Sequence, residues 1–232
     1  MSSPVIDLSH HNPTPDWNAL KAAGVVGIIH KATEGTSYVD PTYGQRAHDA
    51  AAAGLIFVPY HFLHPGSISA QMDWFLSHSS PPAGGRVALD YETDATLDEL
   101  CEAVEYLWEI RPDLQITVYS GHTIKDQLGD SIRGELTNTS LWIAQYTSAS
   151  APTLPAKQWP TWSLWQWTDK ESVPGLSQPA DGNRWNGSAE SLVRWLSPAG
   201  SVPEPETDDS KTIWINIPDD SRLIVNGVEV KL

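Results

Sequence analysis

The chain has 232 residues, 11 Trp and a formal net charge of −15, enough length for one large domain or for one domain with a small appendage. That charge argues against nucleic acid as a partner, because phosphate binding needs Lys and Arg, and it disfavours docking on anionic membranes. No stretch has the apolar length that would insert across a membrane, and the single cysteine, Cys101, allows neither an intramolecular disulfide nor a cysteine-based zinc site.

Segments typical of strands and of helices alternate along the first half of the chain. The expected elements are, in order, a strand at 4–9, a helix at 16–24, a strand at 25–35, a helix at 42–54, a strand at 55–64, a helix at 67–79, a strand at 86–92 and a helix at 96–112. Further strands are expected at 115–121, 140–147 and 162–168, and a closing helix at 188–198. This order indicates a buried parallel α/β sheet, either a barrel or a doubly wound sheet, and we favour a barrel with an irregular second half.

The helix expected at 96–112 has the clearest local signals. Thr96 and Glu99 have the spacing of a capping box, and Pro112 ends the helix. Its apolar residues form one stripe at helical spacing, and Cys101 lies in that stripe. We therefore expect Cys101 to belong to the core rather than to act as a nucleophile.

The composition changes after Pro198, which divides the chain into three parts. Residues 1–198 are expected to form the barrel, and residues 199–210, rich in Pro and acidic residues, a solvated linker. Residues 211–232 are expected to form a small β-meander with a hairpin turn at Asn226-Gly227. So short a segment cannot bury a core alone, so it must dock on the barrel, on a copy of itself or on a target such as a wall.

Two carboxylates follow one another at the end of the strand at 86–92. Side chains alternate along a strand, so Asp90 and Glu92 point to one face while Leu89 and Tyr91 point to the other. In a parallel α/β domain the carboxyl ends of the strands line the ligand site. Other polar side chains are expected at the same rim, and they are Asp7, Glu34, Tyr60, His61, His64 and Asp181. Carboxylates together with aromatic side chains point to glycoside hydrolysis, in which one acid protonates the leaving oxygen and another stabilises the cationic sugar.

Ordered motifs along the chain carry a resemblance to a known family. VIDLSHHN, HKATEG, PYHF, ALDYE, LWIAQYT and LWQWTD…DGNRWNG resemble, in this order, the motifs of family 25 glycoside hydrolases, the Chalaropsis-type lysozymes found in many phage endolysins. The resemblance spans residues 4–197. It implies a modified TIM-like β/α barrel of about five β/α units with a few further strands. It also implies cleavage of the β-1,4 bond between N-acetylmuramic acid and N-acetylglucosamine of bacterial peptidoglycan.

The resemblance gives roles to the residues at matching positions. Glu92 is implied to be the general acid and Asp90 its partner at the anomeric centre, with Asp7 and Asp181 as supporting carboxylates. The side chains expected to contact substrate, by the resemblance or by their place at strand ends, are Tyr60, His61, Glu34, Trp142, Gln145 and Trp165.

The spacing of the acids leaves the stereochemistry open. Retention by a carboxylate nucleophile needs the two carboxyl groups about 5–5.5 Å apart, and inversion needs them about 6.5–9.5 Å apart. Substrate-assisted enzymes do not follow this relation. We favour net retention in which Asp90 steadies the 2-acetamido group of muramic acid.

Two other classes of protein compete with this interpretation. A metal-dependent peptidoglycan amidase or glycan deacetylase could use His10, His11, His61 and His64, but these residues form no HExxH pattern. A non-enzymatic glycan-binding barrel would have lost its acid, whereas Asp90 and Glu92 are both present. We expect neither a metal nor a cofactor.

The start of the chain bears on where such an enzyme is made. The segment MSSPVIDLSHHN has no basic start and no apolar h-region, so it does not resemble a Sec signal peptide. We expect synthesis in the host cytoplasm and action on the cell wall after holin-type release. Besides peptidoglycan, a second copy of the chain is a candidate partner, through the free strand edges of residues 211–232.

Overall fold

The computed structural model describes residues 3–201, 223–225 and 228–230. The chain divides into two compact units, Met1–Val202 and Pro203–Leu232, and each is described by itself. Within the described ranges no helix is both long and apolar enough to cross a membrane.

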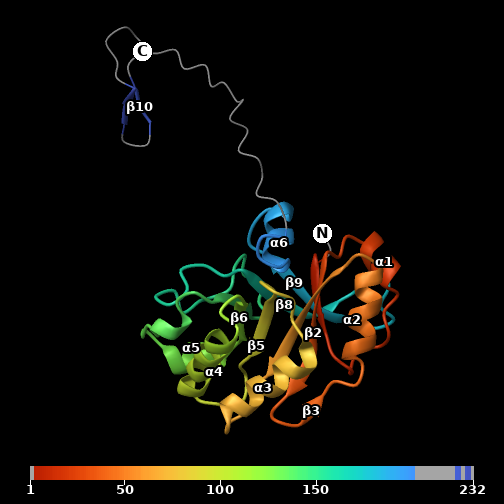
Figure 1. Cartoon of the computed structure of the whole chain (residues 1–232). Helices are drawn as coiled ribbons and strands as arrows, with labels where there is room; N and C mark the ends of the chain where they lie inside the picture. The colour runs from red at the N-terminus through yellow and green to blue at the C-terminus, as the bar shows by residue number, and fades with distance from the viewer. Residues whose placement is uncertain (1–2, 202–222, 226–227, 231–232) are drawn as a thin grey trace. The chain divides into compact units, whose positions relative to one another are not determined.

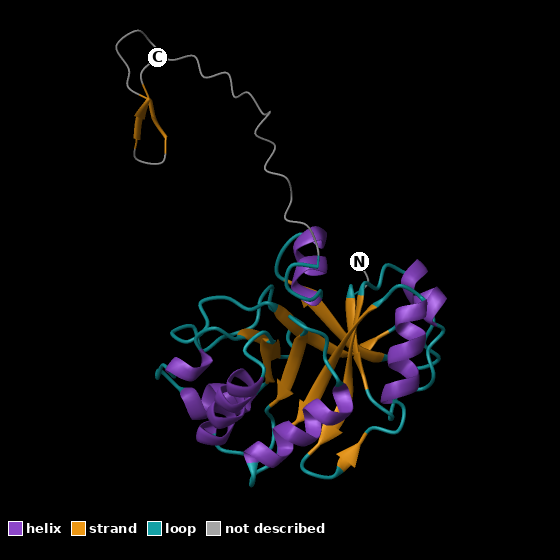
Figure 2. Ribbon diagram, in the orientation of Figure 1, coloured by secondary structure: helices purple, strands orange, loops and turns teal. Residues whose placement is uncertain are grey.

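A closed β-barrel forms the body of the first unit (Figures 1 and 2). Its strands are β1 (Val5–Leu8), β2 (Gly27–Glu34), β4 (Ile56–Phe62), β5 (Arg86–Asp90), β6 (Gln115–Ser120), β7 (Ser140–Ala144), β8 (Leu164–Glu171) and β9 (Ala180–Trp185). Neighbours from β1 through β8 are parallel, and β9 runs antiparallel to both β8 and β1, which closes the barrel. A short strand, β3 (Tyr38–Val39), pairs antiparallel with the end of β2.

Helices follow the first five barrel strands and make five β/α units. They are α1 (Trp17–Ala22), α2 (Tyr43–Ala52), α3 (Ile68–Ser79), α4 (Leu97–Ile110) and α5 (His122–Leu128). The capping box predicted at Thr96 and Glu99 is present at the start of α4, and Cys101 is buried in the core. The modified β/α barrel expected from the sequence is therefore confirmed, with an irregular second half of β7, β8 and β9.

One end of the barrel is closed by the last helix of this unit, α6 (Ala189–Leu196). Leu192 and Leu196 of α6 pack in the interior cluster with Val5 and Ile29 from the first two strands. Gly27 allows this close approach, because a Cβ there would lie 2.5 Å from Cδ1 of Leu196. Figure 2 shows the parallel strands running away from α6, so their carboxyl ends form the opposite end of the barrel.

The second unit contains a two-stranded antiparallel sheet. β10 (Leu223–Val225) pairs with β11 (Val228–Val230), with Leu223 opposite Val230 and Val225 opposite Val228. The turn predicted at Asn226-Gly227 lies outside the described residues. The remainder of the predicted linker and the first strand of the predicted meander lie outside the described residues.

Candidate active site

The carboxyl end of β5 carries the pair of acids singled out in the sequence. Leu89 and Tyr91 pack outward in the cluster beneath α3 and α4, whereas Asp90 faces the barrel. Asp90 is 5 % exposed, and its Oδ1 has no hydrogen-bond partner in the part of the chain that the structure describes. Glu92, just past the strand, is exposed. One buried and one accessible carboxyl group therefore lie side by side.

Both acids are held above their ordinary pKa. Burial raises the pKa of Asp90 well above its usual range, the charge of Glu92 adds to the rise, and Lys31 opposes it. Partial desolvation also raises the pKa of Glu92; Lys31 and His122 oppose this rise, and Asp181 adds to it. The repulsion between the two carboxylates thus raises the pKa of Asp90, the buried one of the pair, because it has less access to water. The pair can retain a proton at a pH where an ordinary carboxyl group has lost it.

A second pair of acids comes from β1 and β9. Asp7 lies opposite Asp181 in the antiparallel register of these strands, and a side-chain hydrogen bond joins them. Burial raises the pKa of Asp7 well above its usual range, and the charge of Asp181 adds to the rise. Asp7 therefore keeps the shared proton, and Asp181 accepts the hydrogen bond.

Amides and an indole hold Asp7 in place from below. Asn183 Nδ2 donates to Asp7 Oδ2 at 2.7 Å, and Gln166 Nε2 donates to Asp7 Oδ1 at 3.1 Å. The opposite ends of the two amides are also fixed: Trp142 Nε1 donates to Asn183 Oδ1 at 2.6 Å, and Tyr119 Oη donates to Gln166 Oε1 at 2.9 Å. These contacts give the Asp7 carboxyl group one fixed orientation.

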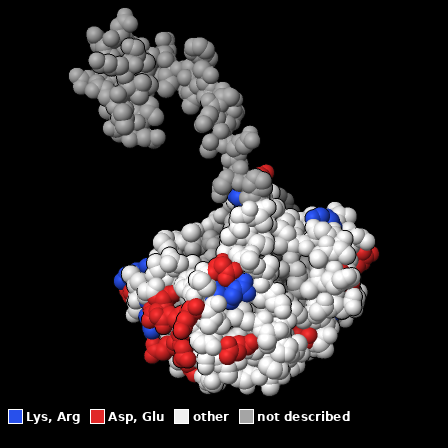
Figure 3. All heavy atoms as spheres, in the orientation of Figure 1, with Lys and Arg blue, Asp and Glu red and all other residues white. Residues whose placement is uncertain are grey.

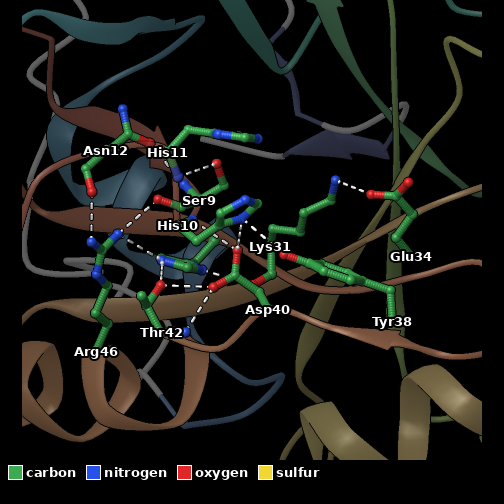
Figure 4. A network of polar contacts seen from close by, with 11 residues as sticks. Ser9, His10, His11, Asn12, Lys31, Glu34, Tyr38, Asp40, Thr42 and Arg46 are labelled. Carbon is green, nitrogen blue, oxygen red and sulfur yellow. Dashed lines mark hydrogen bonds and ion pairs between the residues drawn. The ribbon is translucent and has the colours of Figure 1, made fainter.

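One cation, Lys31 of β2, stands among the acids. Figure 4 shows its side chain extended toward Glu34, to which Nζ donates a hydrogen bond. Glu34 also pairs with His64, Nε2 to Oε1 at 3.0 Å, and Lys31 Nζ lies 4.3 Å from the centroid of the Phe62 ring. Burial would raise the pKa of Glu34, but the hydrogen bonds from Lys31 and His64 outweigh it and lower the pKa. Glu34 thus fixes the ammonium group that opposes the raised pKa of both catalytic candidates.

A polar network ties down the loop after β1, which carries His10 and His11. Asp40 accepts hydrogen bonds from the backbone N–H of His10 at 2.8 Å and from Oγ1 of Thr42 at 2.7 Å, and His10 Nδ1 lies 3.1 Å from its Oδ2. Arg46 of α2 donates to two carbonyl groups of the same loop, as Figure 4 shows. His10, one of the residues considered as a metal ligand in the sequence, is here part of the network that holds this loop. Among the residues described, no three His, Cys, Asp or Glu side chains come together in a group that could hold a metal ion.

The predicted substrate contacts divide into accessible and buried side chains. Tyr60 is half-buried on β4; burial raises its pKa, and the charges of Asp90, Asp7 and Glu92 add to the rise. Glu34 and Gln145 are also half-buried at the rim. These side chains remain candidates for contact with substrate.

Three of the predicted contacts are buried in the structure. His61 is 0 % exposed, and its ring nitrogens bond to Thr33 Oγ1 and Gln71 Oε1. Trp142 is 2 % exposed, and Trp165 is 1 % exposed with Nε1 donating to the Gln145 carbonyl at 2.8 Å. His61 lies near the end of β4, whereas Trp142 is in the middle of β7 and Trp165 at the start of β8.

A cleft opens beside Glu92. It has a volume of about 480 Å³ and runs over the start of α5 and the segment after β7. The lining residues include Glu92, Tyr119, His122, Lys125, Gln145 and Tyr146. An accessible acid at the edge of an aromatic-lined cleft, with a buried acid next to it, suits the cleavage of a glycosidic bond.

Comparisons with known proteins agree with this geometry. Residues 6–176 match the family model described as glycosyl hydrolases family 25. Lysozyme M1 of Streptomyces globisporus is 30 % identical over 210 residues, which cover 81 % of this chain and 69 % of that protein. The crystal structure of the bacterial lysozyme from Streptomyces coelicolor superposes with a TM-score of 0.72 at 28 % identity, covering 82 % of this chain and 95 % of the other. The CTP1L endolysin gives a TM-score of 0.68 at 25 % identity, covering 84 % and 69 %.

Proposed function

Because the chain belongs to glycosyl hydrolase family 25, it is a glycoside hydrolase of the lysozyme type, and we propose how its acids cleave the β-1,4 bond between N-acetylmuramic acid and N-acetylglucosamine. The observation that carries the proposal is the pair formed by an accessible Glu92 and a buried Asp90 at the open end of the barrel. Identification of the new chain end in digested peptidoglycan tests it.

Glu92 is the general acid. Its raised pKa keeps a proton available, and its place at the cleft edge lets the carboxyl group reach a glycosidic oxygen. The proton passes from Glu92 to the leaving oxygen of N-acetylglucosamine as the glycosidic bond breaks. Glu92 is then a carboxylate that can take a proton from the water that completes hydrolysis.

Asp90 acts on the other side of the bond through the substrate. Its unpartnered Oδ1 is a buried acceptor that a donor from the substrate can satisfy. The N–H of the 2-acetamido group on muramic acid is such a donor, and its carbonyl oxygen then attacks the anomeric carbon as the leaving group departs. Attack of water on this cyclic intermediate restores the acetamido group and gives net retention.

Asp7, Asp181 and Tyr60 support the cationic sugar. Asp181, the ionised member of the pair, supplies negative charge near the anomeric centre, and Asp7, held by the fixed amides, keeps it in place through their shared hydrogen bond. Tyr60 brings a hydroxyl group to the same place. Glu34 acts through Lys31, which favours the ionised form of Asp90.

The rival metal-dependent amidase or deacetylase makes a different prediction about chelators. No step proposed above uses a Lewis acid, so hydrolysis of purified walls should continue at full rate after exhaustive dialysis against EDTA. Wall clearing with and without added zinc measures this. Loss of activity on chelation together with its return on adding zinc would replace the glycosidase mechanism with a metal-assisted one.

The similarity to the CTP1L endolysin supports action on the bacterial cell wall. We propose that the chain reaches the wall by endolysin-type release through holin-made lesions. The acidic surface agrees with a partner other than nucleic acid: Asp and Glu gather over α4 and α5 in Figure 3, where α4 exposes Glu102, Glu105 and Glu109.

The second unit is proposed to serve wall binding or self-association rather than catalysis. Deleting residues 203–232 should leave hydrolysis of soluble glycan fragments within about twofold of the full chain, because the four proposed catalytic carboxyl groups lie in the first unit. Turnover on fragments, mass in solution and pelleting with intact walls are the three measurements. The deletion should lower either the mass or the pelleting. A truncated chain that fails to fold or loses turnover on fragments would make residues 203–232 part of the catalytic domain.

A further inference from the structure

The cleft beside Glu92 contains an ammonium group that makes no ion pair with any described carboxylate. Lys125, on α5, is half-buried, and its Nζ donates to Gln145 Oε1 at 2.6 Å and to Thr153 Oγ1 at 3.1 Å. Both acceptors are neutral. Burial lowers the pKa of Lys125, and the charge of the neighbouring Asp126, an exposed residue, opposes this only through space.

Gln145 holds this ammonium group in a fixed position. Its Oε1 accepts two more hydrogen bonds, from the backbone N–H of Thr153 at 3.1 Å and from Thr153 Oγ1 at 2.8 Å. Its backbone is fixed as well, because the N–H donates to Gln166 and the carbonyl accepts from Trp165 Nε1. A lysine ammonium has three N–H donors, and two are used, so one donor remains for a ligand in the cleft.

Not every described cation in this chain of net charge −15 has a carboxylate partner: Arg86, like Lys125, donates only to neutral oxygens, but Lys125 also lines the cleft. Lys31 pairs with Glu34, and Lys157 pairs with Asp130 at 3.1 Å. Desolvating an ammonium without a counter-charge costs free energy, and an anion that enters the cleft would recover it. Glu92 and Lys125 line the same cleft, so one glycan bound there can contact both side chains.

We propose that Lys125 is a specificity-determining residue that binds a carboxylate carried by the glycan. This inference rests on the function proposed above. N-acetylglucosamine has no charge, whereas muramic acid carries a lactyl ether whose carboxylate is either free or joined to a stem peptide with carboxylates of its own. Charge-assisted hydrogen bonding to either carboxylate would orient the muramic acid residue next to Glu92.

Three forms of one peptidoglycan preparation test the inference. The first keeps its stem peptides, the second is peptide-free and has free lactyl carboxylates, and in the third all carboxylates are converted to neutral N-methylamides by carbodiimide coupling. The measured quantity is the ratio of kcat/KM on carboxylate-bearing glycan to kcat/KM on amidated glycan. Lys125→Gln should lower this ratio about tenfold relative to the unaltered chain, because it loses one charge-assisted hydrogen bond. Lys125→Arg should restore most of the ratio, because it keeps the charge.

Lys157→Gln is the matched control, because it removes an equal charge that is exposed and does not line the cleft. It should leave the ratio unchanged. If the kcat/KM ratio of Lys125→Gln falls only for the peptide-bearing glycan, Lys125 binds the peptide carboxylates. If it falls for the peptide-free glycan, Lys125 binds the lactyl carboxylate. An unchanged ratio in Lys125→Gln, or an equal fall with Lys157→Gln, would overturn the inference. Failure of the unaltered chain to release reducing ends from any form would instead contradict the proposed function.

Discussion

Glu92→Gln is expected to lower the rate of wall lysis by about a thousandfold, the range for removal of a general acid. Glutamine keeps the size and hydrogen-bonding capacity of the side chain but has no proton to give to the leaving oxygen. Glu92 is exposed and lies beyond the end of β5, so the fold should remain intact. The measurement is the loss of turbidity of a wall suspension, with the melting temperature recorded on the same sample.

Glu102→Gln provides the control for this experiment. Glu102 is exposed on α4 and takes no part in the acid cluster, so its substitution removes one charge without removing the proposed donor. It should lyse walls at the rate of the unaltered chain. Near-normal lysis by Glu92→Gln would show that another group protonates the leaving oxygen.

Asp90→Asn should have two opposite effects, on activity and on stability. Activity should fall by about a hundredfold or more, because the amide cannot take the charge that steadies the acetamido group. Stability at pH 7 should rise, because asparagine has no charge and so removes the cost of desolvating a buried carboxylate. For a chain of this length each kcal/mol moves the melting temperature by about 2–4 °C.

The sign of the stability effect follows from proton linkage. The pKa of Asp90 is raised in the folded state, so the folded chain binds the proton more tightly than the unfolded chain. Stability from this group is fully present below the unfolded pKa, about 3.9, and is lost as the pH rises toward the folded pKa. Asparagine does not titrate, so the variant should be more stable than the unaltered chain at pH 7, with the difference shrinking toward pH 3.

Asp113→Asn gives a control of opposite sign. Hydrogen bonds from Arg111 and from the Gly84 backbone lower the pKa of Asp113, so its charge stabilises the fold near neutral pH. Its substitution should lower the melting temperature at pH 7. Thermal melts of both variants from pH 3 to pH 8 separate the two cases. The difference in melting temperature between Asp90→Asn and the unaltered chain should be larger at pH 7 than at pH 3. An equal difference at both pH values would show that burial of the Asp90 charge does not destabilise the fold.

Local sequence patterns predicted the part of the site that each strand carries by itself. Alternation along β5 placed Asp90 inward and Tyr91 outward, and the parallel order of the strands brought Asp7 and Tyr60 to the same end of the barrel. These features depend on strand periodicity and on the direction of the chain, which a sequence shows directly.

Other parts of the site depend on contacts between distant segments. β9 was not predicted, because PADGNRW contains Pro, Asp, Gly and Asn, residues that are rare in strands, yet it carries Asp181 and Asn183. The short helix α5 lies between Gly121 and Gly129, and its length gave no periodic signal, so Lys125 was missed. The burial of His61 and Trp165 follows from side chains packed against them, of which strand ends give no indication.

Lys31 was missed for a different reason. It stands in the HKATEG motif but was not considered as a partner for the acids, since its contact with Glu34 depends on the bend of β2 at this point. The register between β2 and β4 shifts between Lys31 and Thr33, and this irregularity cannot be deduced from composition. A cation among converging carboxylates is nevertheless a general expectation, because unpaired buried charges are costly.

Identification of the new chain end tests the central claim most directly. Purified peptidoglycan is digested with the full chain, the new reducing ends are reduced with borohydride, and the sugar alcohols are released by acid hydrolysis. A muramidase that uses Glu92 and Asp90 predicts that muramicitol accumulates in step with the loss of turbidity, and that Glu92→Gln produces none. Glucosaminitol in its place, or new free amino groups without new reducing ends, would contradict the claim.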